Sequence, residues 1–238
     1  MKISLNCGPF LPYLLTFVPF LFGLVISLAG NKDAIMKSFF DEKVEDGRID
    51  LYWTIAMSMF PTGGTLGSIF SLVAPKTLSR KLILISANVL GLCGSILYLL
   101  AYFLKTYACF VLSRLVHGTA VGILMSFGIV TYLQMVIPKQ AGFASTLVQP
   151  IINFGIVLSS TMNLNAIIGD KWLISIAPLV VSQALTIIWM IILPESPVFS
   201  MQVSGDILNV GGQLRKIRPR NWDCEKEAHD IHKERLLC

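Results

Sequence analysis

Charge is scarce in this sequence. Asp, Glu, Lys and Arg make up 14% of its 238 residues, whereas about a quarter of the residues of a soluble domain are charged. Hydrophobic residues supply 54% of the chain, and the mean hydropathy is +0.70. This composition excludes an ordinary soluble domain and predicts a membrane protein.

The sequence also lacks the patterns that mark metal sites, enzymes and nucleic-acid binding. It has five cysteines, an odd number, and no Cys-x-x-Cys pair, so no disulfide framework is expected. The cysteines and histidines near the C-terminus do not have a common zinc spacing. There is no phosphate-binding loop, dinucleotide fingerprint or nucleophile-base set, and no basic patch is interleaved with aromatic residues. We therefore expect no metal, no cofactor, no nucleic-acid partner and no enzymatic activity.

Long apolar runs take the place of charge. A helix of about 20 apolar residues spans a bilayer. Six segments have this character: Phe10–Gly30, Leu51–Ala74, Leu82–Leu104, Tyr107–Ile137, Phe143–Gly169 and Trp172–Leu193. We expect an all-α membrane protein whose six transmembrane helices form two inverted three-helix repeats, because a unit of three spans repeated in tandem reverses its topology. Residues 1–197 would make this bundle, and residues 198–238 a helical cytoplasmic tail.

Lysine and arginine indicate the orientation of these spans. Lys76, Arg80 and Lys81 lie in the short loop between the second and third segments, and seven further basic residues lie in the tail. Such residues favour the cytoplasmic side of a membrane. We therefore expect both regions, and both termini, to be cytoplasmic. The first loop, Asn31–Asp50, has four basic and six acidic residues and carries less weight.

Two amides stand out in the fifth apolar segment. Gln149 and Asn153 are four residues apart, so they share one face of a helix. An amide both donates and accepts hydrogen bonds, which suits a neutral polyhydroxyl substrate. The alternative from spacing alone is that both residues form hydrogen bonds between helices of the bundle.

The fourth apolar segment contains a permanent charge and a histidine. The guanidinium of Arg114 could tie helix ends to carboxylates or carbonyls, or could extend to the membrane surface. We interpret His117, one turn further on, as a packed side chain rather than a proton relay. The spacings Gly63–Gly67 and Gly118–Gly122 predict close contact between helices.

Several of these landmarks occur in one order. They are Leu51-Tyr52-Trp53, Gly63-Gly64, Gly67-Ser68, Arg80-Lys81, Arg114 with Gly118, Gly142, Thr146-Leu147-Val148-Gln149, Gly155-Ile156, Trp172 and Pro194-Glu195-Ser196-Pro197. From about residue 10 to residue 235 the chain resembles the N-terminal half of the facilitative glucose transporters, the sugar porter branch of the major facilitator superfamily.

The resemblance implies roles for two sets of residues. Gln149 would contact the sugar, Ile152 and Ile156 would line the same route, and Asn153 shares the face of Gln149. Basic and acidic groups of the cytoplasmic face would form a salt-bridge network that holds the outward-open state. The members of this network would be Arg80, Lys81, Arg114 and Glu195. The resemblance also implies a location in the plasma membrane.

The chain departs from the family pattern at several charges. The position of a glutamate after the fourth helix is taken by Gln134 or by Met135, depending on the landmark used for alignment. Val198 stands where the family has an arginine. Because charges of both signs are lost, and losing both partners of a buried pair is less harmful than losing one, we expect relaxed gating rather than an unfolded protein.

Two functions remain open at this point. The first is facilitated diffusion of a hexose or similar small polyhydroxyl solute, incomplete in a lone half because the substrate site lies between two halves. The second is a non-transporting truncated form that binds and modulates full-length transporters. The expected partners are a small neutral sugar or polyol, the lipid bilayer, and a second transporter half or a full-length transporter.

Overall fold

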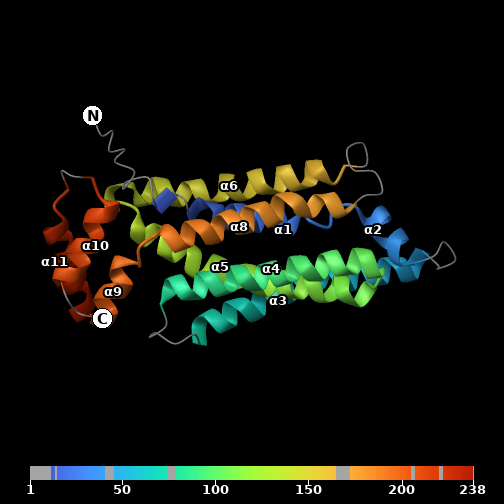
Figure 1. Ribbon diagram of the computed structural model, residues 1–238, viewed down its shortest axis with the longest axis horizontal. Coiled ribbons are helices and arrows are strands. Elements are labelled where there is room, and N and C mark those ends of the chain that lie inside the picture. The colour runs from blue at the N-terminus through green and yellow to red at the C-terminus, as the bar shows by residue number, and fades with distance from the viewer. Residues whose placement is uncertain are drawn as a thin grey trace.

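A computed structural model gives the architecture (Figure 1). It describes residues 12–13, 15–40, 46–73, 79–164, 172–204, 207–219 and 222–237. Every regular element in these ranges is a helix, which confirms the all-α prediction for the described part of the chain. The long helices form an elongated bundle, with three short helices gathered at one end.

Six helices make the bundle. They are α1 (Phe17–Ile26), α3 (Asp46–Val73), α4 (Arg80–Leu104), α5 (Tyr107–Met135), α6 (Ala141–Met162) and α8 (Ala177–Ile192). Two short turns, η2 (Pro138–Gln140) and η3 (Trp172–Ile176), precede α6 and α8. In Figure 1, α1, α6 and α8 run along one side of the bundle, and α3, α4 and α5 along the other.

The two ends of the bundle carry different structures. The short helix α2 (Lys32–Phe39) lies at one end. The tail helices lie at the other: α9 (Pro197–Ser204), α10 (Ile207–Ile217) and α11 (Cys224–Leu237). These tail helices share a small core of their own that includes Met201, Leu214 and Ala228. We call these the α2 end and the tail end.

Four of the six predicted spans are confirmed as helices long and apolar enough to cross a membrane. Within the described residues they are Arg80–Leu104, Tyr107–Met135, Pro138–Met162 and Trp172–Ile192. The helix α3 has 28 residues and is long enough, but its serines and threonines make it less apolar. The described helix α1 has 10 residues, and Pro19 lies in its first turn, where a missing N–H costs no helical hydrogen bond.

Glycines allow two pairs of helices to approach closely, as predicted for α3 and α5. A Cβ on Gly63 would lie 2.2 Å from the Leu115 carbonyl oxygen, and one on Gly118 2.1 Å from the Phe60 carbonyl oxygen. A second contact of this kind joins α1 and α6, where a Cβ on Gly23 would lie 2.1 Å from the Ile152 carbonyl oxygen. Any larger residue at these three positions would separate the helices.

Candidate functional site

The two predicted amides lie together on the exposed surface of α6. The Gln149 Nε2 donates to the Asn153 Oδ1 at 3.3 Å, and both side chains are exposed. Pro150 lies between them inside the helix, so the carbonyl of Thr146 lacks the N–H it would otherwise receive. The exposed large residues nearby, Phe154 and Val157, are apolar. Exposed hydroxyl residues lie on the same face at Ser145, Thr146 and Ser160, so the amides belong to a surface of mixed polarity.

The two isoleucines predicted beside these amides are not equivalent. Ile152 is 6% exposed, and its backbone meets Gly23 at the contact between α1 and α6. Ile156 is half-buried. The structure therefore brings only Ile156 towards the face of Gln149 and Asn153, because the close glycine contact turns Ile152 towards α1.

A second polar surface, which the sequence reasoning missed, follows α3. Five exposed hydroxyl side chains recur at helical spacing: Thr54, Ser58, Thr62, Thr65 and Ser68. Each donates to the carbonyl four residues earlier at 2.7–3.0 Å. The spacing of three or four residues between these hydroxyls is the sequence signal that could have revealed this surface. In Figure 1, α3 and α6 form opposite edges of the bundle.

Two predicted gating residues meet at the tail end as reciprocal helix caps. The Glu195 carboxylate accepts from the Ser79 hydroxyl at 2.7 Å and from the Lys81 N–H at 3.3 Å, at the start of α4. The Lys81 Nζ donates at 2.7 Å to the carbonyls of Ile191 and Leu193, at the end of α8. The opposite charges thus complement the dipoles of two adjacent helix ends.

A third gating residue, Arg80, binds an amide instead of a carboxylate. Its Nη1 donates to the Gln134 Oε1, which also accepts from the Ser196 hydroxyl at 3.1 Å. Of the two residues that the sequence left open for the family's glutamate position, Gln134 is the one that contacts Arg80. Met135, the other choice left open by the sequence, is 2% exposed and packs in the core.

The location predicted for Arg114 is wrong. It lies about 20 residues before Gln134 on the same helix, which is roughly 30 Å along the axis. Its Nη1 donates to the Val25 carbonyl at 3.0 Å, and its guanidinium lies 4.9 Å from the centre of the Phe60 ring. The side chain therefore belongs to the middle of the bundle and has no place in the tail-end cluster.

Arg114 is one of several donors that hold the last turn of α1. The Ser27 carbonyl accepts from the Asn163 Nδ2 at 2.8 Å, and the Leu28 carbonyl from the Tyr98 hydroxyl at 3.3 Å. Carbonyls at a helix end have no partner within the helix. Side chains from α4, α5 and the end of α6 supply partners here, and so fix the end of α1.

His117 is packed, as predicted. It is 0% exposed, its Nδ1 lies 3.0 Å from the Ser113 carbonyl, and its Nε2 lies 3.1 Å from the Ser95 hydroxyl. The Ser95 hydroxyl also lies 3.0 Å from the Gln183 Oε1. This polar network joins α4, α5 and α8 inside the bundle.

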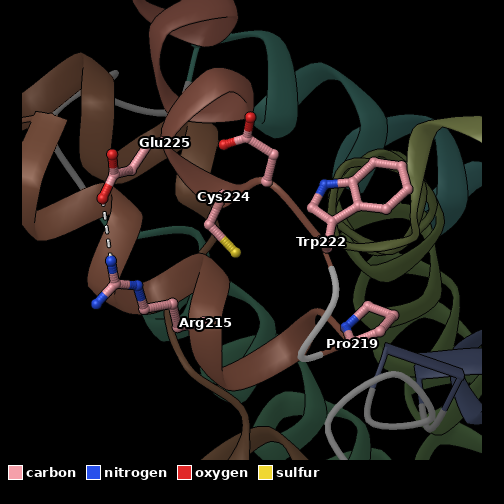
Figure 2. A pocket seen from close by; sticks show the side chains of 6 residues that line it. Arg215, Pro219, Trp222, Cys224 and Glu225 are labelled. Atoms are coloured by element: carbon pink, nitrogen blue, oxygen red, sulfur yellow. Dashed lines mark hydrogen bonds and ion pairs between the residues drawn. The ribbon is translucent and has the colours of Figure 1, made fainter.

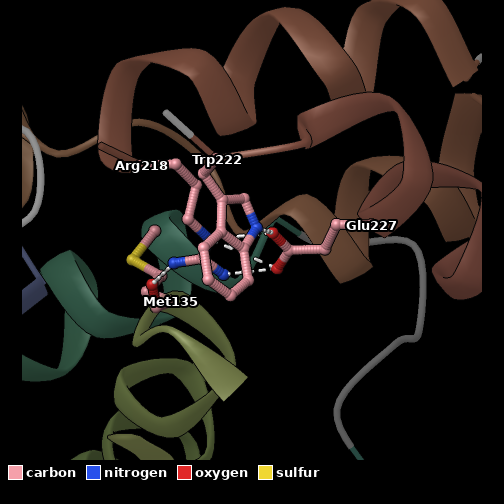
Figure 3. Close-up of polar contacts among 4 residues, drawn as sticks. All are labelled: Met135, Arg218, Trp222 and Glu227. Carbon is pink, nitrogen blue, oxygen red and sulfur yellow. Dashed lines mark hydrogen bonds and ion pairs between the residues drawn. The ribbon is translucent and has the colours of Figure 1, made fainter. Parts of the chain in front are cut away.

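The tail is attached to the bundle by a buried arginine (Figure 3). The Arg218 Nε and Nη2 donate to the Glu227 carboxylate at 2.9 and 2.6 Å, and Nη1 donates to the Met135 carbonyl at the end of α5. The Trp222 Nε1 donates to the same carboxylate at 2.7 Å. Lys139 lies 5.7 Å from the centre of the Trp222 ring.

A pocket of about 420 Å³ lies beside this attachment (Figure 2). Arg215 and Glu225 form an ion pair of 3.1 Å at its edge, and the Cys224 sulfur points into it. Burial and the nearby Glu227 carboxylate raise the pKa of the Cys224 thiol. Because Arg215 is already paired with Glu225 and Asp223 also lines the pocket, the pocket offers no unpaired positive charge to an anion.

Comparison with known proteins gives relatives of one kind. The family model "Sugar (and other) transporter" matches residues 13–232. The human solute carrier family 2, facilitated glucose transporter member 7, is 29% identical over 226 residues, which are 90% of this chain and 44% of the relative. The facilitated glucose transporter protein 1 of Caenorhabditis elegans is 26% identical over 224 residues, 90% of this chain and 44% of the relative.

Solved structures have the same fold. The proton:xylose symporter XylE, bound to 6-bromo-6-deoxy-D-glucose, superposes with a TM-score of 0.78 at 17% identity, over 94% of this chain and 52% of the symporter. The inward-open xylose transporter XylE from E. coli gives 0.77 at 20% identity, over 95% of this chain and 55% of that one. The chain thus spans less than half the length of the curated relatives it matches. With its family match and its apolar helices, the chain is a multi-pass membrane protein and belongs to the Sugar (and other) transporter family.

Proposed function

We propose that this chain forms one wall of a pathway for facilitated diffusion of a hexose or a similar small polyhydroxyl solute. The observation that carries the proposal is the exposed and hydrogen-bonded amide pair, Gln149 and Asn153, on α6. Placing an amide in contact with lipid at membrane depth costs free energy, so such groups contact water, substrate or other protein groups. Their donors and acceptors match the hydroxyls of a sugar, and Ile156 would border the same path.

The pattern of helix contacts supports two inverted three-helix repeats. In such a repeat, α1 corresponds to α5, α3 to α6, and α4 to α8. Under this correspondence, the contact of α1 with α6 matches the contact of α5 with α3. The contact of α4 with α5 likewise matches that of α8 with α1. The glycine contacts at Gly23 and Gly118 correspond in the same way. This correspondence supports the proposal of a six-span bundle over residues 1–197.

A second bundle would complete the pathway. The polar surfaces of α3 and α6 lie at opposite edges of the described bundle and are exposed. A complementary bundle, in the same polypeptide or in another transporter chain, would cover both edges. Residues 198–238 and both termini would face the cytoplasm of a cell whose plasma membrane holds the protein.

The tail-end cluster would act as a weak gate in this cycle. Lys81 and Glu195 cap two adjacent helix ends, while Arg80 is held by the neutral Gln134. A bond from arginine to an amide is weaker than one to a carboxylate. Opening at this end would therefore break fewer strong contacts than in a fully charged network.

Sugar uptake into liposomes tests the proposal. The chain would be reconstituted alone and with the C-terminal half of a related transporter, and saturable uptake is expected only with both. Gln149→Leu should lower apparent sugar affinity about tenfold, the effect of losing one or two hydrogen bonds. Thr161→Val, a polar-to-apolar change elsewhere on α6, should have no effect. Unchanged affinity in Gln149→Leu would remove this residue from the site.

A further inference from the structure

A second hollow, of about 460 Å³, lies at the α2 end of the bundle. Three elements form its walls: α2 with the residue that follows it, the last turn of α4 with its cap, and Trp172 of η3. The proposed transport pathway uses none of these residues. The hollow therefore raises the question of what it holds.

The inner wall of this hollow is aromatic and fixed. The Trp172 ring is 1% exposed, and its centre lies 5.1 Å from that of Tyr102 and 5.9 Å from that of Phe39. Edge-to-face packing of this kind holds the rings in one arrangement. The hollow is therefore formed before any ligand arrives.

Two ammonium groups border the hollow. Lys37 on α2 and Lys105 at the end of α4 are both exposed, and neither has a carboxylate partner among the residues that the structure describes. Lys32, by contrast, is paired with Asp50. Within the described residues, the hollow thus presents two ammonium groups without an ion-pair partner above an aromatic wall, which favours an anion with an apolar part.

The hollow also opens onto the membrane-facing surface. Phe103, one of its lining residues, is 70% exposed, and its neighbour Leu104 is 62% exposed. The helix α4 has 25 residues, about 37 Å, and so extends past the roughly 30 Å hydrocarbon core of a bilayer. Its last turn therefore lies at the depth of lipid headgroups.

One buried donor in the wall has no acceptor. The Trp172 Nε1–H has no hydrogen-bond partner within the described ranges, although nearly all buried donors in proteins have one. Because this nitrogen is itself buried, a ligand in the hollow would lie against the ring and not against the N–H. A phosphate group would bring the negative charge that Lys37 and Lys105 attract.

We propose that this hollow binds the headgroup phosphate of an acidic phospholipid between Lys37 and Lys105, with an acyl chain along Phe103 and Leu104. The aromatic wall supports the glycerol and the start of the chain. Such a lipid would join α2 to the end of α4 and stabilise this end of the bundle.

The backbone at Lys105 provides a variant that tests binding without harming the fold. Lys105 caps α4 with a φ of 50°, a conformation that glycine adopts more easily than lysine. Lys105→Gly removes one charge and should leave the unfolding midpoint unchanged or higher in neutral detergent. Combined with Lys37→Gln, it removes both charges. Lys216→Gln with Lys226→Gln removes two exposed charges at the tail end as the matched control.

The experiment measures thermal unfolding and retained lipid by native mass spectrometry, with phosphatidylglycerol or phosphatidylcholine at equal molar ratio. Phosphatidylglycerol should raise the midpoint and phosphatidylcholine should not, and each lysine removed should weaken binding about fivefold. The tail control should keep the full shift. Equal stabilisation by phosphatidylcholine, or a full shift in the Lys37→Gln, Lys105→Gly variant, would overturn the proposal. An equal shift of the unfolding midpoint by inorganic phosphate without lipid would show that the ligand is a soluble anion and not a lipid.

Discussion

Two arginines of the described residues are almost fully buried: Arg114 lies on α5 inside the bundle, and Arg218 lies between the tail and the last residue of α5. Arg114 is 2% exposed and Arg218 is 4% exposed. Each donates to a carbonyl at the end of a helix, Val25 in α1 for the first and Met135 in α5 for the second. Only Arg218 also has a carboxylate, that of Glu227, while Arg114 lies over the Phe60 ring.

The difference shows how the surroundings of a buried cation determine its partner. Within the membrane, a carboxylate would add a second ion to be desolvated, so backbone dipoles and a ring face are the less costly partners. Between the tail and the bundle, a bidentate pair with a carboxylate costs less free energy of desolvation and fixes the direction of the attachment. Arg114 therefore depends on many weak partners, and Arg218 depends mainly on one strong partner.

Removing the strong partner should have the largest effect. Glu227→Ala leaves the Arg218 charge, whose side chain is 1% exposed, without its carboxylate. Breaking one side of a buried pair costs about 3 kcal/mol or more. Hydrogen exchange in α10 and α11 should accelerate accordingly, while α4 stays protected. The double variant Arg218→Met, Glu227→Leu should recover part of the loss, and equal exchange in both variants would show that the charge is not the cause.

Removing the arginine with weak partners should cost less. Arg114→Met takes away the charge and its bond to the Val25 carbonyl together, so no unpaired ion is left. The Val25 carbonyl still accepts from the Leu28 N–H at 3.3 Å, so we expect a loss of about 2 kcal/mol, that of one hydrogen bond from a charged donor, read as a lower unfolding midpoint in detergent. Arg114→Lys tests the planar geometry of the guanidinium, because an ammonium cannot keep the contacts with both the Val25 carbonyl and the Phe60 ring. A larger loss than in Glu227→Ala would contradict the comparison.

The carboxylate of Glu227 should also control a nearby thiol. Burial and Glu227 raise the pKa of Cys224, so the folded tail keeps a proton that the unfolded chain releases. This contribution to stability is fully present below the ordinary thiol pKa and is lost as pH rises through the raised pKa. Alkylation of Cys224 at pH 8 should be several-fold faster in Glu227→Ala than in the native chain. Glu225→Gln, the exposed neighbour, is the control, and equal rates in all three would disprove the link.

The smallest effect should come from giving a third arginine a carboxylate. Arg80 is half-buried and donates to the Gln134 amide. Gln134→Glu should raise stability by less than about 1 kcal/mol, because the pair is partly solvated. The gain in unfolding midpoint should shrink as salt increases. A gain that does not depend on salt would point to packing, and Gln134→Met serves as the apolar control.

The sequence predicted much of the helical bundle and part of the candidate site. Apolar runs located four spans, and glycine spacing located the contact of α3 with α5. Hydropathy undervalues α3 because its hydroxyls count as polar, although each is satisfied inside its own helix. The four-residue spacing of Gln149 and Asn153 placed them on one face because helical geometry alone decides this.

Other features had no signal in the sequence. The carbonyl acceptors at the end of α1 belong to every residue, so nothing marks Val25, Ser27 or Leu28 as partners for side chains. Arg114 is different, because the predicted topology did carry a signal: the fourth segment begins on the side away from the cytoplasm, and Arg114 lies near its start. The burial of Ile152 was not predicted because the rotation of α6 is set by its contact with Gly23, which depends on the partner helix.

The hydroxyl row on α3 has a chemical consequence. Thr54, Ser58, Thr62, Thr65 and Ser68 each give their single proton to their own helix. Towards a neighbouring helix or a solute, this row therefore offers oxygen atoms that can only accept. Whatever binds against it has to bring the hydrogen-bond donors.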